Sequence, residues 1–287
     1  MVSQASDSPT GADKATRFGR ETSVVPIGGG LYRAILHQSW WIITGPNGGY
    51  IAAILLRAMV AAVDDASRRP RSLTVQYLRP PTEGDVIIEV VTERSGRTVT
   101  NLTARMTQDD KLIALALGAF GTDKPDSLSF DESNGLADVV GLESVPVPES
   151  VEVVEVDPDR DVPMRAHYDL RWVIGALPFT TDGAAGERAR SGGWLRPVEQ
   201  VPVDEVVLAA MSDAWMPPVF SKLAAPAPVP TVDLTIHFRS LPADPLGFCF
   251  VLFESPVASH GYLVEHGQLL APDGTLLAES RQLAVLA

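Results

Sequence analysis

The most apolar stretch of the chain covers residues 50–63, in which Arg57 is the only charged residue. A helix that is apolar on every side is expected to be buried on every side. It is too short to cross a bilayer, which takes about 20 apolar residues. The pattern therefore predicts the central helix of a globular domain. The Gly-Pro-Asn-Gly-Gly sequence at residues 45–49 marks its start, and the glycines allow another backbone or a ligand to come close.

Segments with strand composition, separated by short turns, surround this helix in the sequence. One lies at residues 31–36 and leads through Trp40 and Trp41 to the helix. A buried helix needs a covering layer, and successive strands joined by short turns form an antiparallel sheet. We therefore expect a curved sheet wrapped around the helix. The strands after the helix are expected at residues 73–78, 85–93, 98–107 and 111–121.

The second half of the chain repeats this order. Residues 73–77 (Leu-Thr-Val-Gln-Tyr) match residues 234–238 (Leu-Thr-Ile-His-Phe) at an offset of 161 (234 − 73). Residues 111–114 match residues 275–278 at an offset of 164 (275 − 111). Such a repeat indicates two copies of one fold in one chain. In the second copy we expect a helix at residues 204–215, with strands at residues 167–173, 193–198, 231–239, 246–254, 259–270 and 275–285.

The formal net charge of −13 is concentrated in one segment. Residues 123–161 hold 12 acids and only two bases, Lys124 and Arg160. We interpret this segment as an acidic linker between an N-terminal repeat at 23–122 and a C-terminal repeat at 162–287. Residues 1–22 are expected to form a flexible N-terminal arm. The acidic balance argues against nucleic acid binding.

The chain lacks several familiar signatures. It has no Gly-x-Ser-x-Gly elbow, no His-Glu-x-x-His, no paired-cysteine spacing and no glycine-rich nucleotide loop. We therefore expect no metal and no cofactor. The single cysteine, Cys249, cannot form an intrachain disulfide, and no secretion signal is visible, so a cytoplasmic location is expected.

Asp213 is unusual because it lies within the apolar sequence of the second predicted helix. Its helical neighbours include Ala209, Ala210 and Met216. Burying a carboxylate costs several kcal/mol or raises its pKa, which a chain accepts mainly at functional positions. The alternatives are that Asp213 faces solvent or lies at a broken helix end.

Three short segments resemble the bacterial acyl-CoA thioesterase II family, in the family's order. They are Ser212-Asp213, Thr231-Val232-Asp233 with Phe238 further along the strand, and residues 277–282 (Leu-Ala-Glu-Ser-Arg-Gln). The resemblance implies an α+β double hotdog fold, in which each repeat wraps a curved antiparallel sheet around a buried helix. It also implies hydrolysis of an acyl-CoA substrate to a free acid and CoA.

The resemblance further implies that Asp213, Thr231 and Gln282 orient the attacking water. Asp213 would accept its proton, and the other two would fix its direction. The sequence departs from the family pattern at Leu234, Arg239 and the Leu283-Ala284 pair, which bears on substrate preference. The simpler alternatives are a strand-start hydroxyl at Thr231 and a solvated side chain at Gln282.

The two repeats are expected to share one site. Applying the two offsets places Pro70 opposite Thr231 and Gly118 opposite Gln282, and neither can hold water with a side chain. The first repeat instead offers backbone N–H groups at the start of its long helix. These groups, at Gly48, Gly49 and Tyr50, suit a developing oxyanion, unless the glycines serve only close packing.

Substrate-binding candidates follow from residue chemistry. Arg68, Arg69 and Arg71 suit the phosphates of coenzyme A, and Trp215 suits an acyl tunnel. A solvated loop and a core aromatic are the alternatives. Two rival functions remain at this point, an acyl-CoA-binding or regulatory protein without turnover and a hydratase of the same fold. The latter generally needs a His soon after the aspartate, and Asp213 is followed by Ala-Trp-Met-Pro-Pro. The sequence leaves homo-oligomerisation open.

Overall fold

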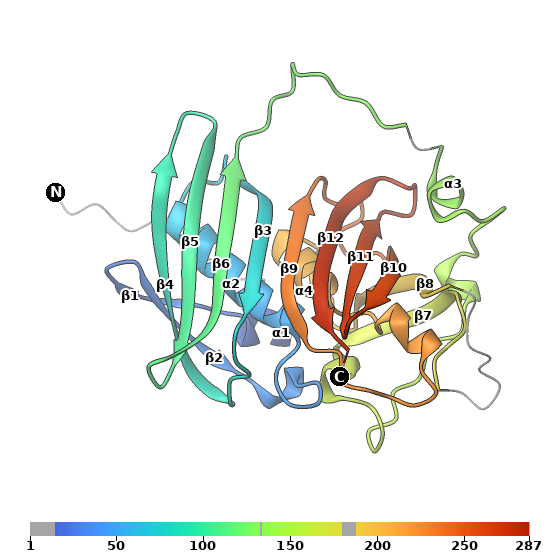
Figure 1. Cartoon of the computed structure of the whole chain (residues 1–287). Coiled ribbons are helices and arrows are strands. Elements are labelled where there is room, and N and C mark those ends of the chain that lie inside the picture. The colour runs from blue at the N-terminus through green and yellow to red at the C-terminus, as the bar shows by residue number, and fades with distance from the viewer. Residues whose placement is uncertain (1–14, 133, 180–187, 287) are drawn as a thin grey trace.

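The structure is a computed structural model that describes residues 15–132, 134–179 and 188–286. In these residues, twelve strands form one continuous antiparallel sheet (Figure 1). Its order is β1-β2-β4-β5-β6-β3-β9-β12-β11-β10-β8-β7, so the first six positions come from the N-terminal half. The strands are β1 Val25–Gly28, β2 Leu31–Leu36, β3 Arg69–Tyr77, β4 Gly84–Ser95, β5 Val99–Gln108, β6 Lys111–Gly121, β7 Tyr168–Ile174, β8 Arg190–Pro197, β9 Thr231–Phe238, β10 Cys249–Ser259, β11 Tyr262–Leu270 and β12 Leu276–Val285.

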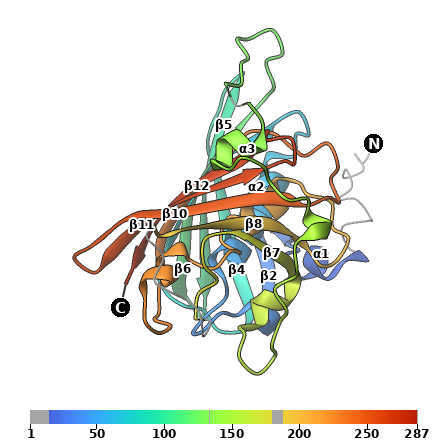
Figure 2. The same cartoon turned by 90° about the vertical axis from the view of Figure 1, so that its right-hand side faces the viewer.

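Two helices, α2 (Gly48–Val63) and α4 (Glu205–Met211), lie in the concave side of this sheet, and the strands of both halves curve around them (Figure 2). Both belong to one apolar core that also includes the inward-facing residues of the strands. The α-helices of the described chain are α1 Arg17–Glu21, α2 Gly48–Val63, α3 Leu136–Val140 and α4 Glu205–Met211, and the 3₁₀ turns are η2 Gln38–Trp40, η3 Pro148–Ser150, η4 Pro163–His167 and η5 Pro218–Lys222.

Helix α2 is the predicted central helix, and that prediction is confirmed. Every residue from Gly49 to Met59 is buried. Asn47 caps the helix by accepting the Tyr50 N–H at 3.1 Å. The one charge, Arg57, is 9% exposed and donates from Nε to the Thr22 hydroxyl at 2.8 Å. A buried guanidinium is thus hydrogen-bonded, as its desolvation requires.

The expectation of a flexible arm is wrong for residues 15–22, and residues 1–14 lie outside the described chain. Phe18 in α1 is buried, and its ring lies edge-on to Trp40 at 5.8 Å. Thr22 is fully buried where it meets Arg57. One buried aromatic residue and one buried hydrogen bond thus fix this short segment against the first repeat.

The two halves meet at strands β3 and β9, which pair antiparallel. Thr74 and Thr235 lie directly opposite each other, and their hydroxyls are 3.0 Å apart. The same two residues are equivalent at the sequence offset of 161, so a pseudo-twofold axis passes between them. This geometry confirms the predicted pair of repeats.

Several predicted boundaries were wrong. Arg69 and Arg71 lie in β3 and not in a connection before it. The first strand, in contrast, has its predicted bounds, and Trp40 lies in η2 between that strand and α2. The strand predicted at residues 259–270 begins only at Tyr262, because His260 and Gly261 form the β10–β11 turn with positive φ values of 54° and 78°. Such values belong to tight turns and not to extended strands.

The segment that joins the repeats is attached to the outer face of the second one. Leu136 and Val140 of α3 are buried in an apolar cluster with Trp194, Phe250 and Leu252, which project from the sheet away from α4. Three side chains of β7 and β8 also donate to carbonyl groups of this segment. They are Arg190 to Val140 at 2.6 Å, Trp194 to Pro146 at 2.8 Å and Arg171 to Pro148 at 2.6 Å.

Candidate active site

Helix α4 ends at Met211, four residues before the predicted end. The hydroxyl of Ser212 donates to the Leu208 carbonyl at 2.8 Å, and the Asp213 N–H makes a long 3.4 Å contact with the Ala210 carbonyl. The chain therefore tightens into a turn and leaves the helix ahead of Pro217 and Pro218. The prediction that Asp213 lies within a helix is wrong. Asp213 occupies the broken helix end that was the alternative.

The side chain of Asp213 lies against the N-terminus of α2. Its Oδ2 accepts from Asn47 Nδ2 at 2.9 Å and from the Gly49 N–H at 3.1 Å. Asn47 Nδ2 also donates to the Asp213 carbonyl at 2.6 Å. A residue of the second repeat is thus held by the helix start of the first. The positive end of a helix stabilises a carboxylate in this position.

The two glycines of α2 make this approach possible. A Cβ on Gly48 would lie 2.9 Å from Asp213 Oδ2, and one on Gly49 would lie 2.3 Å from the Ala210 carbonyl oxygen. The two glycines therefore allow the end of α4 and the Asp213 carboxylate to pack closely against the start of α2. The Tyr77 hydroxyl, which donates to the Gly48 carbonyl at 2.8 Å, holds the turn in place.

Desolvation by burial raises the pKa of Asp213 to about 6. Hydrogen bonds from the Gly49 and Gly48 N–H groups, Gln282 and Asn47 oppose this rise by stabilising the charged form. The result is a carboxylate that is ionised at neutral pH and more basic than an ordinary aspartate. These are the properties that general base catalysis requires.

Thr231, Gln282 and a third residue form a chain of hydrogen bonds beside Asp213. The Thr231 hydroxyl donates to Gln282 Oε1 at 3.0 Å. Gln282 Nε2 donates to Glu265 Oε1 at 2.5 Å, and the Gln282 side chain also favours the charged form of Asp213 and so lowers its pKa. Gln282 and Glu265 are only 7% and 5% exposed. The structure thus brings together Asp213, Thr231 and Gln282, the three residues that were predicted to orient the attacking water.

A β-bulge places Thr231 on the helix side of the sheet. Simple alternation would put Thr231 on the opposite face from Leu234, which is buried against the helices. The register between β9 and β12 shifts between Leu283 and Ala284, and Ala284 then pairs with Thr231. The extra residue turns the Thr231 side chain toward Gln282.

Glu265 was missed by the sequence reasoning. It lies on β11, where Leu263 and Leu269 share its face and are buried. An acid in the inward phase of an alternating strand is a signal that the sequence does carry. Burial raises the pKa of Glu265 to about 8, the negative charge of Asp213 adds to the rise, and the Gln282 hydrogen bond opposes it.

Tyr168 on β7 is a second missed residue. Its hydroxyl is buried without a hydrogen-bond partner in the described part of the chain. The phenol interacts with the charge of Asp213, and burial is the larger cause of its raised pKa. A phenol group is therefore buried within electrostatic range of the carboxylate.

The predicted oxyanion donors already have acceptors in this structure. The Gly49 N–H donates to Asp213, the Gly48 N–H also stabilises that carboxylate, and the Tyr50 N–H donates to Asn47. The helix start therefore serves Asp213 directly. A substrate oxygen would have to share these donors.

The predicted substrate-binding arginines lie apart from this cluster and have protein partners. Arg68 donates to the Thr100 hydroxyl at 2.8 Å, and Arg69 forms an ion pair with Glu205 at 2.7 Å. Arg71 pairs with Asp123. Arg69 and Arg71 lie at the start of β3 and Arg68 directly precedes it, whereas Thr231 begins the antiparallel neighbour β9. About seven residues of strand, at about 3.3 Å each, separate the two ends.

Trp215, the other substrate-binding candidate, is a core residue by its contacts. It is 6% exposed, and its ring stacks on Trp172 at 4.9 Å. Its Nε1 donates to the Ser191 hydroxyl at 3.0 Å.

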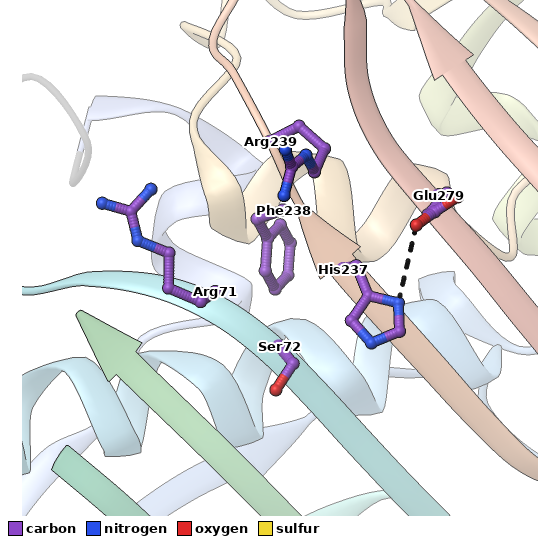
Figure 3. A pocket seen from close by; sticks show the side chains of 6 residues that line it. All are labelled: Arg71, Ser72, His237, Phe238, Arg239 and Glu279. Carbon is purple, nitrogen blue, oxygen red and sulfur yellow. Dashed lines mark ion pairs between the residues drawn. The ribbon is translucent and has the colours of Figure 1, made fainter. Parts of the chain in front are cut away.

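A cavity of about 490 Å³ lies on the other face of the sheet (Figure 3). Ser72 and His237 line it, and they alternate with Leu73 and Ile236, which face the helices. The cavity is therefore separate from the Asp213 cluster. Its lining is completed by Arg71, Phe238, Arg239 and Glu279, of which Glu279 lies 3.8 Å from His237 Nδ1.

Two properties of the described residues bear on other classes of function. No group of three or more His, Cys, Asp or Glu side chains in them is arranged to hold a metal ion. No helix among the same residues is long and apolar enough to cross a membrane.

This double-repeat architecture is the hotdog fold, and solved structures match it over almost the whole chain. A hotdog-fold protein of unknown function from Alicyclobacillus acidocaldarius is 27% identical, with a TM-score of 0.81 and coverage of 95% of this chain and 98% of its own. A putative thioesterase II from Thermobifida fusca YX is 24% identical, with a TM-score of 0.79 and the same coverage. An acyl-CoA thioesterase II from Mycobacterium marinum is 19% identical, with a TM-score of 0.72 and coverage of 94% and 98%.

Family models identify the two halves separately. Residues 37–121 match the acyl-CoA thioesterase N-terminal domain, and residues 148–286 match the acyl-CoA thioesterase C-terminal domain. The chain belongs to the acyl-CoA thioesterase family, as the sequence resemblance predicted. A comparison with curated proteins returned no match. The family supports thioester hydrolysis in general.

Proposed function

We propose that this protein hydrolyses acyl-CoA thioesters to a free carboxylic acid and CoA, with Asp213 as the general base. The observation that carries the proposal is the environment of the carboxylate. Asp213 is desolvated, has a raised pKa, and is held by the N-terminus of α2 next to the Thr231–Gln282 pair. An ionised, desolvated carboxylate with polar neighbours is suited to activating a water molecule.

The reaction can be followed atom by atom. Asp213 takes a proton from water as the water oxygen bonds to the thioester carbonyl carbon. Thr231 and Gln282 hold the water so that it attacks in one direction. The tetrahedral intermediate then collapses, the carbon–sulfur bond breaks, and the proton passes from Asp213 to the sulfur of the leaving CoA. The N–H groups of Gly48, Gly49 and Tyr50 are the candidates for stabilising the oxyanion, since they lie at the positive end of α2.

Replacing Asp213 by Asn tests the general base directly. The amide keeps the shape of the side chain and loses its basicity, so thiol release from acyl-CoA should fall by about 10²–10⁴-fold. Asp85→Asn is the matched control, because Asp85 is exposed on β4 in the first repeat. Full turnover in a folded Asp213→Asn protein would refute the assignment. Acyl-CoA binding without thiol release by the wild-type protein would favour the non-catalytic alternative.

The pH profile provides a second test. Because the pKa of Asp213 is raised to about 6, wild-type turnover should decline as the pH falls through that value. Protonation removes the base from a growing fraction of the molecules. A profile that is flat from pH 5 to pH 7 would contradict the proposal.

A further inference from the structure

The carboxyl group of Glu265 contacts the one side chain that links Thr231 to Asp213. Gln282 Nε2 donates to Glu265 Oε1 at 2.5 Å, and Gln282 Oε1 accepts from Thr231 at 3.0 Å. The Gln282 side chain also favours the charged form of Asp213 and so lowers the pKa of that carboxyl group. Both ends of the Gln282 amide therefore have hydrogen-bond partners, and the side chain acts on Asp213 as well.

Glu265 and Thr231 contact the two ends of the Gln282 amide, so the side chain is held from both sides. A carboxyl group at residue 265 can hydrogen-bond to an amide, whereas an apolar side chain at the same place could not. We propose that Glu265 is a positioning residue that fixes the Gln282 side chain beside Asp213 and the attacking water. This inference rests on the function proposed above.

The two repeats support this role. Glu265 pairs with Gln282 across β11 and β12, and the equivalent pair in the first repeat is Leu102 and Gly118 across β5 and β6. The acid is thus present in the repeat that has a glutamine to orient. Leu102 is 1% exposed, so leucine suits the same place in the same fold.

The groups around Glu265 explain how an acid can be buried at this position. Asp213, from the end of α4, is the charged group that acts on it, and Asp213 in turn interacts with Tyr77 of β3 and Tyr168 of β7. Burial and the charge of Asp213 raise the pKa of Glu265 to about 8. At neutral pH Glu265 is therefore a neutral acid, and its carbonyl oxygen still accepts from Gln282. Ionisation above that pH would add a second negative charge beside Asp213 and oppose a developing oxyanion.

The test compares two substitutions at one position. Glu265→Gln retains an acceptor oxygen and cannot ionise, so it should keep most of the wild-type kcat at pH 7. Wild-type kcat is expected to decline above about pH 8, where Glu265 ionises, and Glu265→Gln should lose that decline. Glu265→Leu removes the hydrogen-bond partner, so kcat should fall by about 10–100-fold, by analogy with the loss of a group that orients a metal ligand. Glu279→Gln, an exposed acid on the outer face of β12, is the control.

A double-mutant cycle separates positioning from structural support. In a Gln282→Leu background, Glu265→Leu should cause little further loss, because the amide that it orients is gone. Independent losses that multiply would overturn the proposal, as would a Glu265→Gln profile that keeps the wild-type alkaline decline. Asp213→Asn is measured in the same panel. If it abolishes turnover while Glu265→Leu keeps the wild-type kcat, the positioning role fails and the proposed function stands. If Asp213→Asn retains turnover, the proposed function itself fails.

Discussion

Three equivalent positions of the two repeats differ in polarity. In the first repeat, β3, β6 and β5 carry Pro70, Gly118 and Leu102; in the second, β9, β12 and β11 carry Thr231, Gln282 and Glu265. The backbone is the same, since both β3 and β9 have a register shift at this point. The polar side chains are therefore confined to one of two similar scaffolds.

The helices explain why the second scaffold has room for polar groups. Helix α2 has 16 residues, and its Met59 covers Gly118, where a Cβ would lie 2.6 Å from the Met59 sulfur. Helix α4 has 7 residues and ends before Asp213. The long helix fills the first repeat with apolar side chains, while the short one leaves space for a polar cluster. The N-terminus of the long helix then completes that cluster from the other side.

The largest effect is expected from Gly49→Val, at the contact between the repeats. Its Cβ would lie 2.3 Å from the Ala210 carbonyl oxygen, and backbone atoms cannot move away as a flexible side chain can. Overpacking of this kind costs about 1–3 kcal/mol or more, so both stability and turnover should fall. Thermal unfolding and thiol release measure the two effects.

Gly48→Ala sharpens this test, because the Cβ of residue 48 would meet Asp213 Oδ2 at 2.9 Å. It should displace the carboxylate and lower turnover more than it lowers stability. Gly118→Ala is the counterpart in the first repeat, where the neighbour is the end of a flexible methionine. Equal losses of turnover in the two alanine variants would contradict the difference between the repeats.

The next prediction concerns the number of sites. Because the first repeat lacks the polar cluster, a non-hydrolysable acyl-CoA analogue should bind once per chain. Titration calorimetry with purified protein measures this number. Two equivalent sites per chain would show that the apolar repeat also binds substrate, and would contradict the functional difference between the repeats.

A smaller effect is expected in the pH dependence of stability. The pKa of Glu265 is raised from 4.5 to about 8 in the folded protein. Between these values the folded state holds a proton that the unfolded state has released, so stability falls as the pH rises. Above about pH 8 both states are ionised and the contribution is constant. The unfolding free energy of Glu265→Gln should therefore fall less than that of the wild type between pH 5 and pH 8, as urea titrations at several pH values would show.

Repeated elements could be predicted from the sequence, but contacts between the repeats could not. The apolar run at residues 50–63 and the matching strand segments led to the two helices and the sheet. Asp213 was found because its neighbours are apolar, although the helix was predicted to continue beyond it. The β-bulge that turns Thr231 inward follows from pairing with β12, which no local pattern shows. The partners of Arg69 and Arg71 likewise depend on residues distant in the sequence, Glu205 and Asp123.

The smallest effect is expected on the outer faces of the sheet. The second repeat is covered there by the acidic connecting segment, whereas Leu117 of the first repeat is 60% exposed. Glu143, Glu149 and Glu152 of this segment are exposed, so replacing all three by Gln should leave turnover almost unchanged. Charges beyond about 8 Å from the site are screened at physiological salt.

Val140→Asp in the same segment should behave differently, because Val140 is fully buried against the second repeat. An unpaired buried charge costs several kcal/mol, so thermal stability should fall. The acids of the segment would then contribute solubility, and its apolar residues would hold it on the second repeat. A loss of turnover in the triple glutamine variant at unchanged stability would contradict this division, because it would mean that the segment's charges act on the Asp213 cluster through the sheet.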